Sequence, residues 1–186
     1  HLLLLHAMDA IRNDARRGQS MGYFINVAAK SLTDTLFMSD FLEFVRSHRD
    51  LCRRVVFEFQ YDDFMGITPA QQKIIDGLTH LGCFISIDNV SHLHINADAM
   101  AESGVNFLKF DAKKLVELCK SDEGTLQVSR MKSSIDRAGI QLIVEKIENN
   151  FALKELLDFE IDYGEGFLFG KPDVEVAYRR KRKVAA

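Results

Sequence analysis

The sequence lacks the features that mark several classes of protein. Its cysteines, Cys52, Cys83 and Cys119, are far apart and form no CxxC pair, which argues against a disulfide framework and a zinc knuckle. No apolar run approaches the roughly 18 residues that a membrane span needs, so we expect no membrane contact from this segment. The formal net charge is only −3, which gives no electrostatic reason to expect a nucleic-acid partner. We expect a cytoplasmic domain, to which the full-length protein could add a membrane anchor upstream.

Linkers, low-complexity tracts and internal repeats are also absent, which indicates a single domain. We expect this domain to span residues 1–178 and to be followed by a basic C-terminal tail, residues 179–186. The 186 residues are few for a closed eight-stranded barrel, which typically needs about 250. Position 1 is His rather than Met, and we therefore expect that residues of the native protein precede it.

Short apolar runs alternate with segments of helical spacing along the whole chain. Helical spacing is clear for Phe37, Phe41 and Phe44, and again for Ile74, Leu78 and Leu81. This alternation predicts a parallel sheet with crossover helices, and therefore an α/β fold. The six predicted strands are Tyr23 to Ala28, Arg54 to Phe59, Cys83 to Asp88, Asn106 to Phe110, Gln141 to Glu145 and Ile161 to Gly164.

Glycines mark the predicted junctions between helix and strand. Gly82, Gly104 and Gly139 each stand where a helical segment ends and an apolar run begins. Glycine adopts the left-handed backbone that commonly ends a helix at little cost. Each of the three glycines therefore supports a helix that is followed by a strand.

Polar residues recur at the C-terminal ends of the apolar runs. In a β/α barrel these ends converge on one mouth, so the residues are expected to surround one ligand. Oxygen donors of this kind suit a hard cation such as Mg²⁺ or Mn²⁺, and a lysine beside them suits a phosphate or a water. Any single member also has a structural explanation, as a strand end or a helix cap, but five successive strands share the pattern. The residues are Asn26, Glu58, Asp88 with Asn89, Lys109 with Asp111, and Glu145.

These residues lie in motifs that resemble the EAL family of cyclic-di-GMP phosphodiesterases and its degenerate receptors. FINVAAKSL (24–32) resembles the family's N-L-S strand and VFEF (56–59) its L-E-I-T strand. SIDNV (86–90) is similar to D-D-F-G, and FLKFD (107–111) to I-K-I-D. VEKIE (144–148) resembles A-E-G-V-E, and GEGFLFGKP (164–172) resembles Q-G-Y-L-F-G-R-P. The resemblance implies a TIM-type (β/α) barrel of the EAL type.

The resemblance also implies roles for individual residues. Lys109 and Glu145 would be catalytic in an active domain, and Glu148 would support Glu145. The implied metal ligands are Asn26, Glu58, Asp88 and Glu145. The implied contacts to the ligand are Asn26, Glu58, Asp88, Asn89, Lys109, Glu165 and Pro172.

Departures from the family motifs lie at the same site. Asn89 stands where the family has an aspartate that bridges two metals, and a neutral amide is a poor ligand for a pair of dications. Glu165 replaces the family glutamine, and Tyr61 replaces a second glutamate. The E-A-L motif would have to precede His1, so the resemblance implies that the first strand and helix of the barrel lie outside this chain. We expect weak metal binding and not two ions.

The motifs and departures together predict a degenerate EAL domain that binds cyclic-di-GMP as an effector with little or no hydrolysis. An active metal-dependent phosphodiesterase and a protein-interaction scaffold without a nucleotide are the alternatives. Within the family, the motif combination looks most like the TipF-type proteins, EAL-like domains associated with flagellar assembly. The resemblance therefore implies a homodimer or a signalling or flagellar protein as partner.

Overall fold

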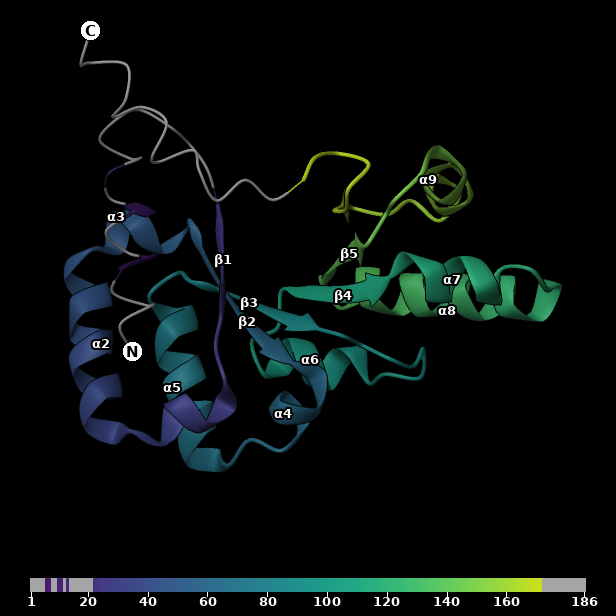
Figure 1. The fold of residues 1–186 in the computed structure, drawn as a ribbon. Helices are drawn as coiled ribbons and strands as arrows, with labels where there is room; N and C mark the ends of the chain where they lie inside the picture. Colours follow the sequence, from purple (N-terminus) through teal and green to yellow (C-terminus); the bar gives the residue numbers. More distant parts are fainter. Residues whose placement is uncertain (1–5, 8–9, 12, 14–21, 172–186) are drawn as a thin grey trace, which may run out of the picture.

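The protein is described by a computed structural model that places residues 6, 7, 10, 11, 13 and 22–171. Within these residues six parallel strands form one curled sheet in sequential order (Figure 1). Every predicted strand is confirmed, with ends that agree within two residues. The strands are β1 (Tyr23–Asn26), β2 (Val55–Gln60), β3 (Phe84–Asp88), β4 (Phe107–Asp111), β5 (Gln141–Glu145) and β6 (Tyr163–Gly164).

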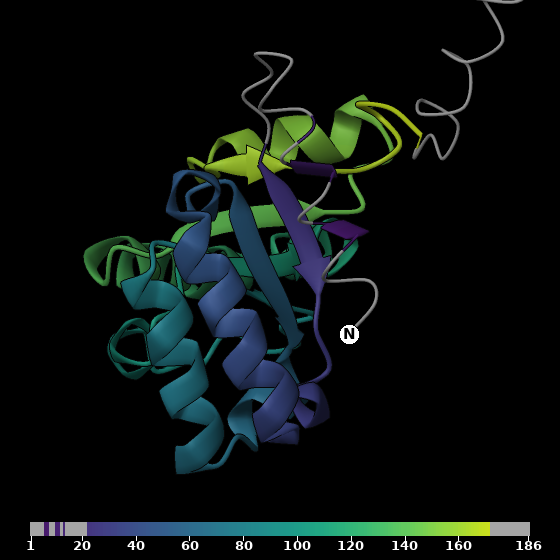
Figure 2. The same ribbon diagram turned by 90° about the vertical axis from the view of Figure 1, so that its left-hand side faces the viewer.

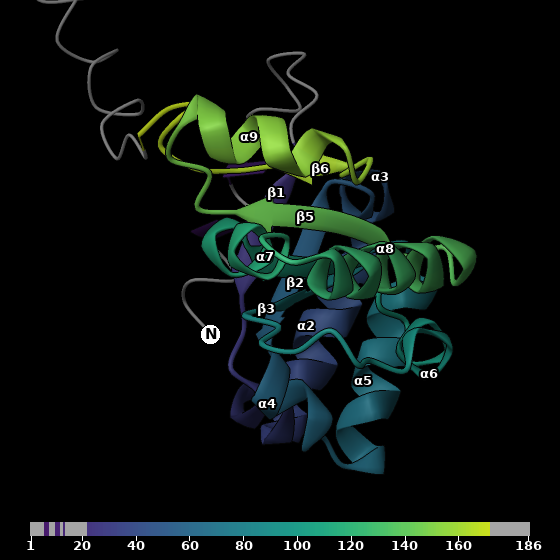
Figure 3. The ribbon, with the colours of Figure 1, turned by 90° about the vertical axis from the view of Figure 1, so that its right-hand side faces the viewer.

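Helices connect the strands and cover one face of the sheet. Figure 2 shows α2 and α5 lying in front of β1 and β2, and Figure 3 shows α7, α8 and α9 packed on the other half of the sheet. No helix within the described part of the chain is both long and apolar enough to span a bilayer. The elements are the 3-10 helix η1 (Ala29–Thr33) and the helices α2 (Thr35–Ser47), α3 (Arg49–Cys52), α4 (Tyr61–Met65), α5 (Pro69–His80), α6 (Ala97–Glu102), α7 (Ala112–Leu118), α8 (Asp122–Arg137) and α9 (Asn150–Leu157).

Local sequence signals set where these helices begin and end. The Thr68 side chain accepts a hydrogen bond from the Gln71 backbone N–H, the Gln71 side chain accepts one from the Thr68 backbone N–H, and Pro69 opens α5. Gly82, Gly104 and Gly139 have φ angles of 97°, 88° and 75°. These φ angles are positive, as in the left-handed backbone that ends a helix and that glycine adopts most easily. The predicted glycine junctions are therefore confirmed.

The two faces of the sheet differ in character because side chains alternate along a strand. The face under the helices is apolar, and its fully buried side chains include Phe57, Phe59 and Ile87. The opposite, inner face carries Glu58 and Lys109, which are also buried. The chain therefore builds its core on one side of the sheet and presents polar groups on the other.

This architecture is a partial (β/α) barrel, as the sequence predicts. Among the described residues β1 and β6 end the strand order and are not paired with each other. Residues 172–186 lie outside the described part, and with them the predicted ligand contact Pro172 and the predicted tail, residues 179–186.

Candidate functional site

The predicted site residues lie at matching heights on neighbouring strands. The parallel register pairs Asn26 with Glu58 across β1 and β2, and it pairs Asp111 with Glu145 across β4 and β5. Side chains of paired residues in parallel strands point to the same face. The sheet thus brings oxygen donors that are distant in sequence to one rim.

Lys109 is the centre of a buried ion cluster on the inner face. Its Nζ lies 2.6 Å from Glu58 Oε2, with both side chains only 6% exposed. This contact is an ion pair between two buried side chains. Lys109 Nζ also donates to Glu165 Oε1 at 3.1 Å and Oε2 at 3.3 Å. One ammonium therefore holds two carboxylates, one buried and one half-exposed.

Burial and ion pairing shift the protonation equilibria of this cluster. Burial raises the pKa of Glu58, which the adjacent Lys109 ammonium offsets only in part. Burial alone would lower the pKa of Lys109, but the Glu58 and Glu165 carboxylates raise it above its ordinary value. The raised pKa of Lys109 keeps its ammonium charged, and this charge 2.6 Å away favours the ionised form of Glu58 against the effect of burial.

A second group of carboxylates, Asp88, Asp111 and Glu145, lies at the ends of β3, β4 and β5. Asp88 Oδ2 accepts from Gln60 Nε2 at 2.7 Å, and Asp88 Oδ1 accepts from the Asn89 backbone N–H at 2.7 Å. Glu145 is buried, and burial raises its pKa; the contact with Lys146 lowers it in part, and the negative charge of the nearby Asp88 carboxylate raises it further. Both burial and a neighbouring carboxylate disfavour the ionised form of Glu145.

Lys146 supplies the cation for this second group. Its Nζ lies 2.6 Å from Glu145 Oε1 and 3.0 Å from Asp111 Oδ2. Both carboxylates raise the pKa of Lys146, and the pKa of Asp111 is lowered because Lys146 and the Lys113 backbone outweigh the effect of burial. The Lys146 backbone has a φ of 60°, which is uncommon for a residue with a Cβ.

Aromatic rings lie one layer deeper, towards the strand N-termini. Phe107 contacts Phe24, Phe84 and Tyr163 at centroid distances of 6.0, 6.0 and 6.1 Å. Lys109 Nζ lies 4.8 Å from the centroid of the Phe24 ring, a distance typical of a cation–π contact. The rings form an apolar floor beneath the Lys109 cluster.

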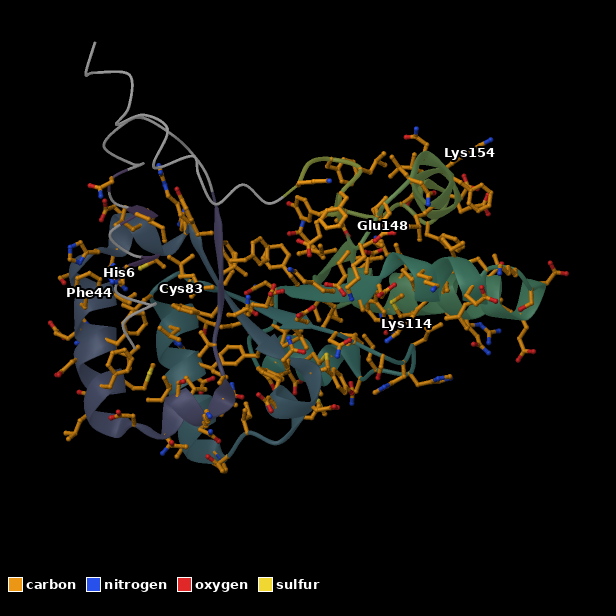
Figure 4. The ribbon with its side chains drawn as sticks, in the orientation of Figure 1. His6, Phe44, Cys83, Lys114, Glu148 and Lys154 are labelled. Atoms are coloured by element: carbon orange, nitrogen blue, oxygen red, sulfur yellow. The ribbon has the colours of Figure 1, made fainter. Side chains whose placement is uncertain are left out.

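A groove of about 850 Å³ lies beside the two clusters. Its lining includes Glu145, Lys146 and Glu148, and the rings of Phe167 and Phe169, which are 59% and 57% exposed. Figure 4 shows Glu148 in the region of β5 and α9, away from Cys83 and Phe44 on the α2 side. Aromatic faces with lysines nearby suit a planar, anionic ligand.

The structure brings most of the predicted site residues together in two clusters, and it leaves Asn26 and Asn89 exposed. Glu58, Lys109 and Glu165 form one cluster, and Asp88 and Glu145 meet in the other. Asn26 is exposed at the end of β1, beside Glu58 in register. Asn89 is exposed and has a φ of 56°, which asparagine tolerates better than most residues.

Three contributors were not predicted from the sequence. Gln60 binds Asp88, Lys146 bridges Glu145 and Asp111, and His92 Nε2 lies 2.9 Å from the Tyr61 hydroxyl. Lys146 had a sequence signal, because it stands at the glycine of the A-E-G-V-E motif, and Tyr61 had one as a departure from the family glutamate. The other two contacts depend on loop geometry that spacing does not encode.

The described carboxylates of the rim do not converge on a common point. No group of three or more His, Cys, Asp or Glu side chains in the described ranges converges so as to hold a metal ion. The candidate carboxylates already have partners from the chain: Lys109 for Glu58, Gln60 for Asp88 and Lys146 for Glu145. The residues as placed therefore do not fit a two-metal centre.

Comparison with known proteins identifies relatives of this chain. The sequence profile of the EAL domain matches residues 1–172. The cyclic di-GMP phosphodiesterase PdeA of Borreliella burgdorferi is 27% identical over 101 residues, which are 54% of this chain and 15% of that protein. The cyclic di-GMP phosphodiesterase PdeF of Escherichia coli is 19% identical over 173 residues, 90% of this chain and 22% of that protein. The chain thus spans less than a quarter of either relative.

Solved structures share the fold. The EAL domain of Mycobacterium smegmatis DcpA has a TM-score of 0.76 at 20% identity, with 96% of this chain and 80% of that chain covered. The FimX EAL domain has a TM-score of 0.76 at 19% identity, with coverage of 92% and 68%. Vibrio cholerae LapD, solved bound to c-di-GMP, has a TM-score of 0.75 at 16% identity, with coverage of 90% and 41%.

Proposed function

Because the chain belongs to the EAL domain family, we propose that it acts in cyclic-di-GMP signalling by binding the dinucleotide with little or no hydrolysis. The observation that carries this proposal is the engagement of the candidate metal carboxylates by side chains of the protein itself. EAL domains generally depend on divalent metal ions, which must generate a nucleophile and stabilise the charge that develops on the phosphate. A rim whose carboxylates are held by lysines is poorly suited to that task.

The groove beside the rim supports the binding half of the proposal. Phe167 and Phe169 present exposed rings there, and purine bases stack on aromatic faces. Lys146 and Lys171 line the same groove and can attract phosphate oxygens. The volume of about 850 Å³ is in the range of small-molecule sites.

Titration calorimetry with cyclic-di-GMP, together with chromatography of the products, tests the proposal. We expect micromolar or tighter binding, and no linear product after prolonged incubation with Mg²⁺ or Mn²⁺. Phe167→Ala should weaken binding about tenfold, since base stacking on an aromatic side chain contributes ~1–3 kcal/mol. Phe151→Ala is the matched control, because Phe151 is a similarly exposed ring on α9 that does not line the groove.

Each alternative function gives a distinct result in the same assay. Accumulation of linear dinucleotide would identify a working phosphodiesterase. Absence of heat and of any rise in melting temperature at saturating dinucleotide would favour an interaction scaffold, because a ligand of the folded state must raise the melting temperature.

A further inference from the structure

We propose that the Lys146 ammonium is a tethered counter-ion, which stands between Glu145 and Asp111 in place of a divalent cation. The inference concerns the unliganded rim and does not depend on dinucleotide binding. It follows from three observations: the bridging contacts of Lys146, its backbone conformation and the neighbouring carboxylates.

Lys146 joins carboxylates from two adjacent strands. Its Nζ lies 2.6 Å from Glu145 Oε1 and 3.0 Å from Asp111 Oδ2. The two acids are paired in register across β5 and β4, so the sheet fixes their separation. A small cation shared by two fixed carboxylates is the arrangement that a bound metal ion would otherwise provide.

The backbone at Lys146 marks the lysine as an unusual choice for this position. Its φ of 60° lies in the left-handed region, which Asn89 and Glu160 alone share with it among the described residues other than glycine. Residues with a Cβ rarely adopt this backbone conformation, and the motif that this segment resembles has glycine at this position. The contacts of the Lys146 ammonium give a reason for a lysine at a position where glycine would adopt the backbone conformation more easily.

The surrounding charges explain why a cation is needed. The Asp88 carboxylate lies close enough to Glu145 for their negative charges to interact, and Asp111 contacts Lys146 from the neighbouring strand. Without Lys146 the three acids would repel one another, and a hard dication would relieve that repulsion. A metal ion must therefore compete with an ammonium that is already in place.

Removing the ammonium should create a metal site. In the Lys146→Gly variant the backbone is relaxed and the carboxylates are free, so we expect Mn²⁺ to bind at least tenfold more tightly than to the unaltered 186-residue chain. Mn²⁺ titration followed by electron paramagnetic resonance, without nucleotide, measures the free ion directly. Lys146→Arg keeps the cation and should bind Mn²⁺ as weakly as the parent.

Two controls separate the counter-ion from other effects. Glu160 also has a left-handed backbone, with a φ of 52°, and it lies in the loop before β6, at the opposite end of the strands. Glu160→Gly therefore relaxes the backbone in the same way, but this variant should not gain Mn²⁺ affinity. Adding Glu145→Gln to Lys146→Gly should abolish the gain, which would assign the new site to Glu145.

Two results would overturn the proposal. The first is Mn²⁺ binding to the parent chain within twofold of the Lys146→Gly variant, because the ammonium would then be no competitor. The second is the absence of any gain in both Lys146→Gly and Lys146→Asn when circular dichroism shows that both are folded. Failure of dinucleotide binding would leave these measurements unaffected, so the two proposals fail separately.

Discussion

The rim carries two lysine-centred clusters on adjacent strands, and they differ above all in burial. Lys109 is 6% exposed and lies between Glu58 and Glu165, whereas Lys146 is 57% exposed and bridges Glu145 and Asp111. Water can replace an exposed ammonium, but it cannot reach a buried carboxylate whose partner has been removed. The comparison indicates that the Lys109 cluster contributes mainly to the stability of the fold. The Lys146 cluster contributes little to stability and instead influences which cations can bind at the rim.

The largest effect is expected for Lys109→Met, which leaves Glu58 buried without a cation. Breaking a buried ion pair from one side typically costs ~3–5 kcal/mol, so the free energy of unfolding in urea should fall by that amount. The double variant Lys109→Met with Glu58→Gln should recover much of the loss, because no charge is then stranded. A loss below about 1 kcal/mol would show that the two clusters are energetically alike.

A pH dependence is expected at Glu145, whose pKa is raised by burial and by the Asp88 carboxyl. A carboxyl with a raised folded-state pKa stabilises the fold fully below its unfolded pKa, near ~4.3, and loses that contribution as the pH rises through the folded-state pKa. The parent should therefore lose stability relative to Glu145→Gln as the pH rises from about 4.3 through the raised folded-state pKa of Glu145. Urea unfolding of both proteins across this range measures the difference, and a change in the opposite direction would contradict the assignment.

The smallest effect is expected for Glu165→Gln, which alters the exposed partner of Lys109. The Glu165 side chain is 47% exposed and Lys109 keeps its pair with Glu58, so stability should change by at most about 1 kcal/mol. Glu58→Gln, the buried counterpart, should change it more. If Glu165→Gln and Glu58→Gln lowered the free energy of unfolding equally, the buried and the exposed partner of Lys109 would not differ in their contribution to stability.

Much of the fold was predictable because hydrophobic period and glycine punctuation are local properties. The apolar runs gave all six strands, and Gly82, Gly104 and Gly139 marked where helices end. The polar residues at strand ends also gave Glu58, Lys109 and Glu145 as members of one rim. The roles predicted for them in metal binding and catalysis stay predictions.

The sequence by itself determined which segments form strands and which polar residues end them, because apolar runs and alternation are properties of neighbouring residues. Only the tertiary structure decided which charges meet. The pairing of Lys109 with Glu165, 56 residues apart, and of Lys146 with Asp111, 35 residues apart, depends on how strands and loops are brought together. Ion pairs form over a few ångströms in space, and spacing along the chain does not encode that distance.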